Sequence, residues 1–146
     1  PDYTPGDLEI EALESSALDD IQGVADIMRQ CQTLGVRFAL DDFGTGYSTL
    51  AYLRYLPAGI LKIDRSFVRN MLDNEEDLVM LKGVLSLADA FQRRVIAEGV
   101  ETIGHASALV AMGCEYGQGY AFARPMPASQ LLEWHAQFSL SIASPG

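Results

Sequence analysis

Two adjacent aspartates, Asp41 and Asp42, follow an apolar segment and precede a turn with two glycines at residues 43–47. Apolar side chains alternate with other residues from Val36 to Leu40, which is the period of a strand with one buried face. Because glycine takes backbone angles closed to other residues, the turn can bend both carboxylates toward one point. Like charges held that close repel unless a divalent cation or a shared proton intervenes. A turn aspartate beside a helix N-cap aspartate explains the same pair without a cation.

Polar residues also follow the other segments that we expect to be strands. In chain order, these strand ends carry Glu11, Asp41 with Asp42, Lys62 with Asp64, Glu98 with Glu101, and Gln118. Parallel sheets place their chemistry at the carboxyl ends of strands, so these side chains should converge on one rim. Oxygen ligands without cysteine or histidine select hard cations such as Mg²⁺ or Mn²⁺. A bridging aspartate flanked by carboxylates suits a two-metal site that hydrolyses a phosphodiester.

Structural roles compete with catalytic ones at each of these positions. Lys62 shares a strand face with Ile60 and should project inward, where a lysine without an acidic partner is costly, so we favour a functional role. Asp64 is interpreted as the N-cap of a short helix at residues 66–68.

The remaining candidates carry weaker signals. Glu98 also suits a solvated turn, and for Glu101 a catalytic role and a capping role beside the next helix stay open. Gln118 between two glycines is weak taken alone. His105 and His135 fall in helical patterns, which favours packing or surface positions over catalysis.

Composition limits the classes of partner and compartment. The chain has 146 residues, enough for one domain, and 49% of them are hydrophobic, enough for a buried core. Its net charge of −10 argues against DNA or RNA as a partner, because no basic stripe faces a phosphate backbone. We see neither a membrane span nor a signal peptide in this stretch. Cys31 and Cys114 have no neighbouring ligand residues, which indicates a reduced, cytoplasmic chain.

Strand-like and helix-like segments alternate along the chain. Strands are expected at residues 8–11, 36–40, 60–63, 95–97 and 115–118, and helices at residues 20–34, 48–55, 74–88, 102–112 and 127–138. The caps expected are Asp73 or Asn74 for the third helix and Thr102 for the fourth. The last helix should bury Leu131, Leu132 and Trp134. This alternation is typical of a parallel sheet with crossover helices.

The sequence resembles the EAL family of cyclic di-GMP phosphodiesterases. The matching stretches are Leu8–Ser15, Asp41–Ser48, Leu61–Phe67, Ala97–Thr102, Gln118–Tyr120 and Ala123–Pro125. They cover nearly the whole chain in the family's order and spacing. The resemblance implies an α/β fold of the (β/α)₈ TIM-like barrel type with one antiparallel strand, and hydrolysis of cyclic di-GMP to linear pGpG.

The resemblance also assigns roles to individual residues. Glu11 and Asp41 would be direct metal ligands, and Asp41 would bridge to a second Mg²⁺ or Mn²⁺ ion that Asp42 also binds. Glu98 would act at that second ion. The others would have supporting roles: Lys62 would hold and polarise the attacking water, Gln118 would orient it, Glu101 would support the site, and Glu14 would anchor the loop at residues 43–48, which couples dimerisation to metal binding in this family.

The chain departs from the family pattern at its beginning. Glu11, Ala12 and Leu13 spell the Glu-Ala-Leu motif that names the family, but their register places them on a later strand. The naming glutamate, a phosphate-gripping arginine and an asparagine are expected upstream of Pro1. A complete barrel needs at least about 200 residues. We therefore expect an incomplete barrel, roughly the C-terminal five βα units at residues 1–138, followed by a tail at 139–146.

This incompleteness shapes the expected partners and the alternatives. The chain should be a fragment of a longer protein with a GGDEF or sensory domain, and the parent could be membrane-anchored through a separate domain. Its open sheet edges should favour a homodimer or a strand-swapped assembly. Alone it should be weakly active or inactive. A catalytically silent cyclic di-GMP receptor is the alternative, whereas a phospho-acceptor receiver domain fails because Lys62 comes one strand too early.

Overall fold

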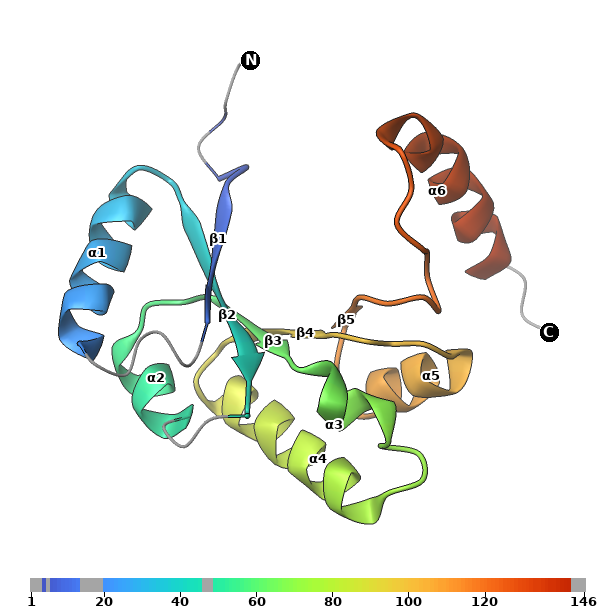
Figure 1. Ribbon diagram of the computed structural model, residues 1–146, viewed down its shortest axis with the longest axis horizontal. Coiled ribbons are helices and arrows are strands. Elements are labelled where there is room, and N and C mark those ends of the chain that lie inside the picture. The colour runs from blue at the N-terminus through green and yellow to red at the C-terminus, as the bar shows by residue number, and fades with distance from the viewer. Residues whose placement is uncertain (1–3, 5, 14–19, 46–48, 143–146) are drawn as a thin grey trace.

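A parallel sheet of five strands forms the centre of the molecule. The computed structural model describes residues 4, 6–13, 20–45 and 49–142. The strands are β1 (Glu9–Leu13), β2 (Arg37–Phe43), β3 (Ile60–Ile63), β4 (Arg94–Ala97) and β5 (Tyr116–Gly117), and each pairs in parallel with the next in chain order (Figure 1). Within the described residues no strand joins β5 back to β1, so the sheet is an open arc of a barrel.

Helices lie along the outer side of this arc, except for the last one, which stands apart from the sheet (Figure 1). They are α1 (Ile21–Thr33), α2 (Thr49–Tyr55), α3 (Arg65–Arg69), α4 (Glu75–Ala90), α5 (Ile103–Ala111) and α6 (Ala128–Ile142). Alternate strand residues point toward the helices and are buried, among them Phe38, Leu40, Leu61 and Ile63, and they pack with Leu53, Leu81 and Leu109 of the helices. The other strand face is therefore left to carry polar groups, as the period of two requires.

Three helix starts form through the expected side-chain caps. The Asp64 carboxylate accepts a hydrogen bond from the Ser66 amide at 2.9 Å, as predicted. Asn74, rather than Asp73, caps α4 by accepting bonds from two amides, and Thr102 caps α5 by accepting from the His105 amide. These caps satisfy amide donors that a helix leaves unpaired in its first turn.

The second strand is longer than its alternation predicts. We expected the strand at residues 36–40 and the turn at residues 43–47, but β2 continues through both aspartates to Phe43, which is fully buried. The pairing with β3 shifts register between Leu40 and Phe43, and Asp42 there has a φ of 55°. This irregularity places an extra residue in the strand, so that Phe43 can return to the helix side.

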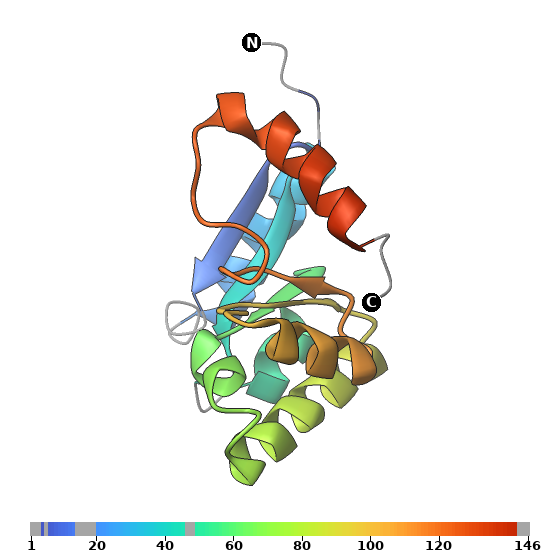
Figure 2. The same ribbon diagram turned by 90° about the vertical axis from the view of Figure 1, so that its right-hand side faces the viewer.

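The last helix departs furthest from expectation. Leu131 and Leu132 are 50% and 82% exposed, so the prediction that they are buried was wrong. Trp134 is partly covered, since its indole donates a hydrogen bond to the Phe122 carbonyl at 3.2 Å and its ring stacks on Phe138. Figures 1 and 2 show α6 set apart from the sheet at the end of a long loop. It also runs to Ile142, past the expected end at residue 138.

Two further expectations concern cysteines and membranes. Cys31 and Cys114 are both free. Cys114 is buried, and burial raises the pKa of its thiol above the ordinary value, which keeps it in the unreactive protonated form. Among the helices that the structure describes, none is both long and apolar enough to span a bilayer.

A tight turn after β5 holds the end of that strand against the end of β4. The Gln118 amide donates to the Ala97 carbonyl at 2.8 Å, and the Val100 amide donates to the Gln118 carbonyl at 3.0 Å. Gly119 packs so closely here that a Cβ atom on it would lie 2.2 Å from the Val100 carbonyl oxygen. Only glycine fits without moving the backbone.

Replacing Gly119 with alanine should therefore destabilise the protein. We expect Gly119→Ala to lower the free energy of unfolding in urea by about 1–3 kcal/mol, the range for overpacking. Gly83→Ala is the matched control, because Gly83 lies in α4 with no atom within 4 Å of an added Cβ. It should raise the stability by about 1 kcal/mol through helix propensity. Equal effects of the two substitutions would contradict the turn geometry.

Candidate metal and phosphodiester site

The side chain of Lys62 projects from β3 into a group of carboxylates on the inner face of the sheet. Its ammonium nitrogen lies 2.6 Å from Glu11 Oε1, 2.7 Å from Glu98 Oε1 and 3.5 Å from Asp41 Oδ1. Lys62 is only 7% exposed. We call these four residues the Lys62 cluster. The inward orientation expected for Lys62 is thus confirmed, and its acidic partners come from three other strands or strand ends.

Backbone pairing explains why these carboxylates meet. Glu11 lies inside β1, opposite Ala39, and not at the strand end where we expected it. Its side chain nevertheless reaches across β2 to Lys62. Glu98 follows β4 directly, and its amide donates to the Ile63 carbonyl at 3.1 Å, which fixes it beside the end of β3. Parallel neighbours in register place alternate side chains on one face, so the sheet assembles the cluster.

The carboxylates keep Lys62 charged despite its burial. Burial lowers the pKa of Lys62, but the hydrogen bonds to Glu11 and Glu98, together with the charges of Glu98 and Asp41, outweigh it and raise the pKa above its ordinary value. A lysine ammonium has three N–H donors and no acceptor. Lys62 therefore donates hydrogen bonds in this site and cannot take up a proton.

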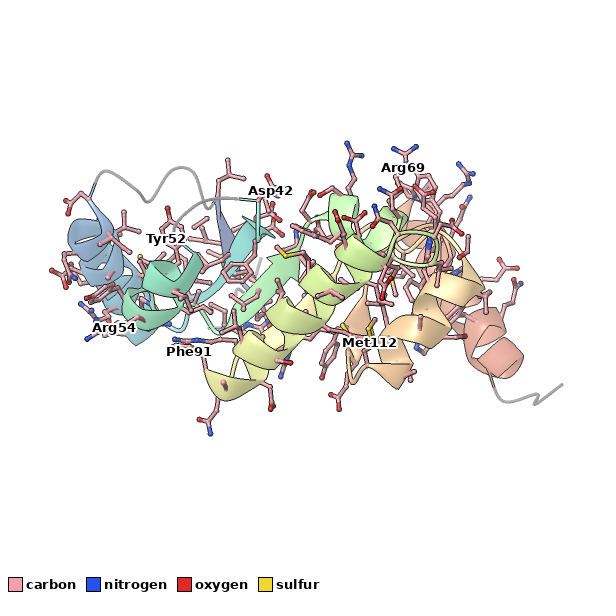
Figure 3. All side chains as sticks on the ribbon, turned by 90° about the horizontal axis from the view of Figure 1, so that it is seen from below. Asp42, Tyr52, Arg54, Arg69, Phe91 and Met112 are labelled. Atoms are coloured by element: carbon pink, nitrogen blue, oxygen red, sulfur yellow. The ribbon has the colours of Figure 1, made fainter. Side chains whose placement is uncertain are left out.

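The aspartate doublet divides between two environments. Asp41 belongs to the Lys62 cluster, and its Oδ1 also accepts a hydrogen bond from the Asp42 amide at 3.0 Å. Asp42 is exposed at the end of β2 (Figure 3). Partial burial and the negative charges of Asp41 and Asp64 raise the pKa of Asp42, while Lys62 and Arg65 oppose the rise. The charge of Asp41 thus acts on Asp42 as expected for like charges held close, and of the two carboxylates Asp41 is the one whose ion pair with Lys62 lies among the described residues.

Two other predicted residues, Gln118 and Glu101, lie outside the cluster. Gln118 is placed at the end of β4 by its backbone hydrogen bonds, and its side chain is exposed. Glu101 is exposed, and in the part of the chain that the structure describes it makes no hydrogen bond or ion pair with the cluster. Glu14 lies outside the described residues. Both histidines are on helices, His105 buried and His135 exposed.

Arg65 is a charged neighbour of this rim that the sequence did not lead us to select. It follows the capping Asp64 at the end of β3. Its positive charge opposes the rise in the pKa of Asp42. Burial raises the pKa of Asp64, but the hydrogen bonds from Ser66 and the Arg65 backbone, together with the charge of Arg65, lower it below the ordinary value. Its Cβ would be only 2.5 Å from a Cβ at Gly99, whose φ is +66°. A cation next to a strand-end aspartate is the signal that would have pointed to it.

The donor chemistry of the rim suits a hard divalent cation. Glu11, Asp41, Asp42 and Glu98 offer only carboxylate oxygens, the ligands that Mg²⁺ and Mn²⁺ prefer. Among the described residues, however, no three acidic, histidine or cysteine side chains are grouped closely enough to hold a metal ion. The Lys62 ammonium lies between the carboxylates that such an ion would bind.

Known proteins are similar to this chain in sequence and in architecture. The family model of the EAL domain matches residues 2–125. MucR of Pseudomonas aeruginosa, a bifunctional diguanylate cyclase/cyclic di-GMP phosphodiesterase, is 41% identical over 128 residues, which are 88% of this chain and 19% of MucR. NbdA of the same species, a cyclic di-GMP phosphodiesterase, is 38% identical over 138 residues, which are 94% of this chain and 18% of NbdA.

Solved structures agree with these sequence matches. The EAL domain of Mycobacterium smegmatis DcpA superposes with a TM-score of 0.84 at 39% identity, covering 92% of this chain and 60% of that one. The PaMucR phosphodiesterase in its c-di-GMP complex gives 0.82 at 40% identity, covering 87% and 51%. The chain thus spans about a fifth of the curated relatives and little more than half of the solved chains. The expected TIM-like architecture is confirmed, and the chain belongs to the EAL domain family.

Proposed function

We propose that this chain is part of a phosphodiesterase domain that hydrolyses cyclic di-GMP to linear pGpG in bacterial second-messenger signalling. The observation that carries the proposal is the Lys62 cluster, which gathers three carboxylates and one ammonium on the inner face of the sheet. The names of MucR and NbdA as cyclic di-GMP phosphodiesterases, and the c-di-GMP complex of PaMucR, support this substrate.

In the proposed reaction a water oxygen adds to one phosphorus of the ring as the bond to the 3′ oxygen breaks. The 3′ oxygen leaves with a proton, and the product is the linear dinucleotide. Lys62 would hold and polarise the attacking water through an N–H donor, since its ammonium has no lone pair to act as a base. A carboxylate beside it, Glu98 or Asp41, is then the group on hand to accept the proton of the water.

Glu11, Asp41, Asp42 and Glu98 are the residues that would hold Mg²⁺ or Mn²⁺, with two ions in a complete site. The ions, when bound, would stabilise charge on the phosphate oxygens and lower the pKa of a bound water. Gln118 would orient the water, Glu101 would support the site, and Glu14 would anchor the loop after β2. These assignments rest on the resemblance of the motifs and on the placement of Gln118 beside the end of β4.

The proposal extends to the whole protein. A cyclase or sensory domain accompanying this one would fit the bifunctional name of MucR. Free Cys31 and Cys114 suit a reducing compartment, so we place the activity in the cytoplasm. The unpaired edges of β1 and β5 would be covered by the rest of the barrel, by a second copy or by a swapped strand.

Hydrolysis should depend on the Lys62 cluster. We expect the purified chain to release pGpG slowly in Mn²⁺, because the solved EAL domains contain structure that this chain does not cover. Asp41→Asn and Lys62→Met should each reduce the single-turnover rate by about 10²–10³. Lys82→Met removes the same charge from the exposed side of α4 and should leave the rate unchanged.

Chromatography of the nucleotides after incubation measures this rate. Unchanged turnover in Asp41→Asn would contradict the proposed site, and full-rate turnover by the chain alone would contradict the need for the remaining structure. Calorimetric binding of cyclic di-GMP without any hydrolysis, in a protein that includes the whole domain, would instead favour the silent receptor.

A second test uses the Asp42→Gly variant to measure the role of Asp42 in hydrolysis separately from its role in stability. Asp42 has a φ of 55°, which glycine adopts without strain. In Asp42→Gly the relief of this backbone strain should therefore offset the stability that is lost because glycine gives the unfolded chain more conformational entropy. We expect its free energy of unfolding to stay within about 0.5 kcal/mol of wild type, while Mn²⁺-dependent hydrolysis falls. Asp73→Gly is the matched control, since Asp73 is an exposed turn residue without a positive φ, and it should lose about 0.4–1 kcal/mol. A larger loss in Asp42→Gly than in Asp73→Gly would show that the aspartate is needed for the fold.

A further inference from the structure

We propose that Lys62 is the counter-cation of the carboxylates in its cluster, and that a divalent cation binds these carboxylates only by displacing the ammonium from Glu11 and Glu98. The inference rests on the proposed function, since it concerns how the same carboxylates receive their metal. It assigns to Lys62 a role before catalysis, as an internal competitor that sets the affinity for the cation.

Carboxylates occupy most of the donor capacity of Lys62. Its ammonium nitrogen lies at hydrogen-bond distance from Glu11 and Glu98, at 2.6 and 2.7 Å, and forms a longer ion pair with Asp41 at 3.5 Å. Its side chain is 9% exposed, and those of Asp41 and Glu98 are also mostly covered, at 19% and 20%. Asp41 and Glu98, which are so little hydrated, need a positive partner, whereas Glu11 is 49% exposed. Within the described residues no other cation forms an ion pair with these three carboxylates.

The same oxygens cannot serve the ammonium and a metal ion at short distance. A cation that takes Glu11 and Glu98 as ligands replaces the ammonium at those carboxylates, and the two positive charges then repel. Binding therefore includes the cost of breaking two charge-assisted hydrogen bonds. The two equilibria are linked: a change that strengthens the ion pairs of Lys62 with Glu11 and Glu98 lowers the affinity for the metal ion by the same factor.

The arrangement also frees Lys62 for the water in the proposed reaction. Two of the three N–H donors of Lys62 are taken by Glu11 and Glu98 in this structure, and Asp41 lies 3.5 Å from its nitrogen. Release of Glu11 or Glu98 to a metal ion would free an N–H group while keeping the ammonium beside Asp41. Metal binding and positioning of the water would then be coupled through one side chain.

The first test compares two lysine variants of the full chain. Binding of Mn²⁺ alone is followed by the loss of the free-ion signal in electron paramagnetic resonance. We expect Lys62→Met to bind Mn²⁺ at least about tenfold more tightly than wild type, because one charge-assisted hydrogen bond is worth that factor or more. Lys82→Met, which removes an exposed lysine and changes the net charge equally, should bind as wild type does.

If Lys62 only supported the fold of the site, Lys62→Met should bind Mn²⁺ more weakly than wild type, since a disordered site binds metal less well. Weaker or unchanged Mn²⁺ binding in a folded Lys62→Met protein would therefore overturn the inference. Equal tightening in Lys62→Met and Lys82→Met would also overturn it, because the effect would then reflect net charge alone.

A second measurement needs no variant, in case Lys62→Met fails to fold. The sequence contains two lysines, Lys62 and Lys82, so lysine-labelled protein gives two resolvable side-chain signals in NMR. Titration with Mg²⁺ should shift the Lys62 signal and leave that of Lys82 in place. A Lys62 signal unmoved at Mg²⁺ saturation, or no binding of Mg²⁺ and Mn²⁺ at all, would overturn the inference. If both tests give the expected results and cyclic di-GMP does not bind, the inference about Lys62 stands and only the proposed function is contradicted.

Discussion

The buried ammonium of Lys62 is the interaction on which the inner face of this sheet depends. Three carboxylates approach one another there, from β1, from β2 and from the end of β4, and their repulsion would separate them without a cation. A charge in a covered site is tolerated only when it is paired and hydrogen-bonded, and Lys62 meets both conditions. Because Glu11 is two strands away from Lys62, the ion pair also fastens the edge strand β1 to the centre of the sheet. The acidic rim and its lysine are thus one electrostatic unit.

Backbone geometry holds this unit in place. The register shift in β2 falls where Asp42 has a φ of 55°, and it lets Phe43 stay in the core. Gly99 and Gly119 let the segments after β4 and β5 pack closely, Gly99 against Arg65 and Gly119 against the Val100 backbone. Glu98 and Gln118 follow these two strands, so their positions are set by packing that only glycine permits.

Local chemistry made much of the fold predictable. Apolar segments between helical patterns located four of the strands, and the alternation was clearest from Val36 to Leu40. Asp64, Asn74 and Thr102 marked helix starts because each side chain bonds an amide within three residues. The misses have a common cause. Leu131 and Leu132 suit a buried face, but burial depends on which surface lies opposite, and none of the described residues covers them. The bulge in β2 was not predicted either, since it depends on the register with β3 and not on the residues of β2 alone.

The sequence by itself determined the chemical character of the site: oxygen ligands, one inward lysine and no histidine or cysteine at the strand ends. It did so because residue type fixes which groups can donate, accept or ionise, and because strand order places those groups on one side. Tertiary structure alone decided how they combine. It separated Asp41 from Asp42, drew Glu11 from within β1 to Lys62 and left Glu101 outside the cluster. Contacts between residues 11, 62 and 98 follow from parallel pairing across the sheet. Distances set by such pairing cannot be predicted from any single segment of the sequence.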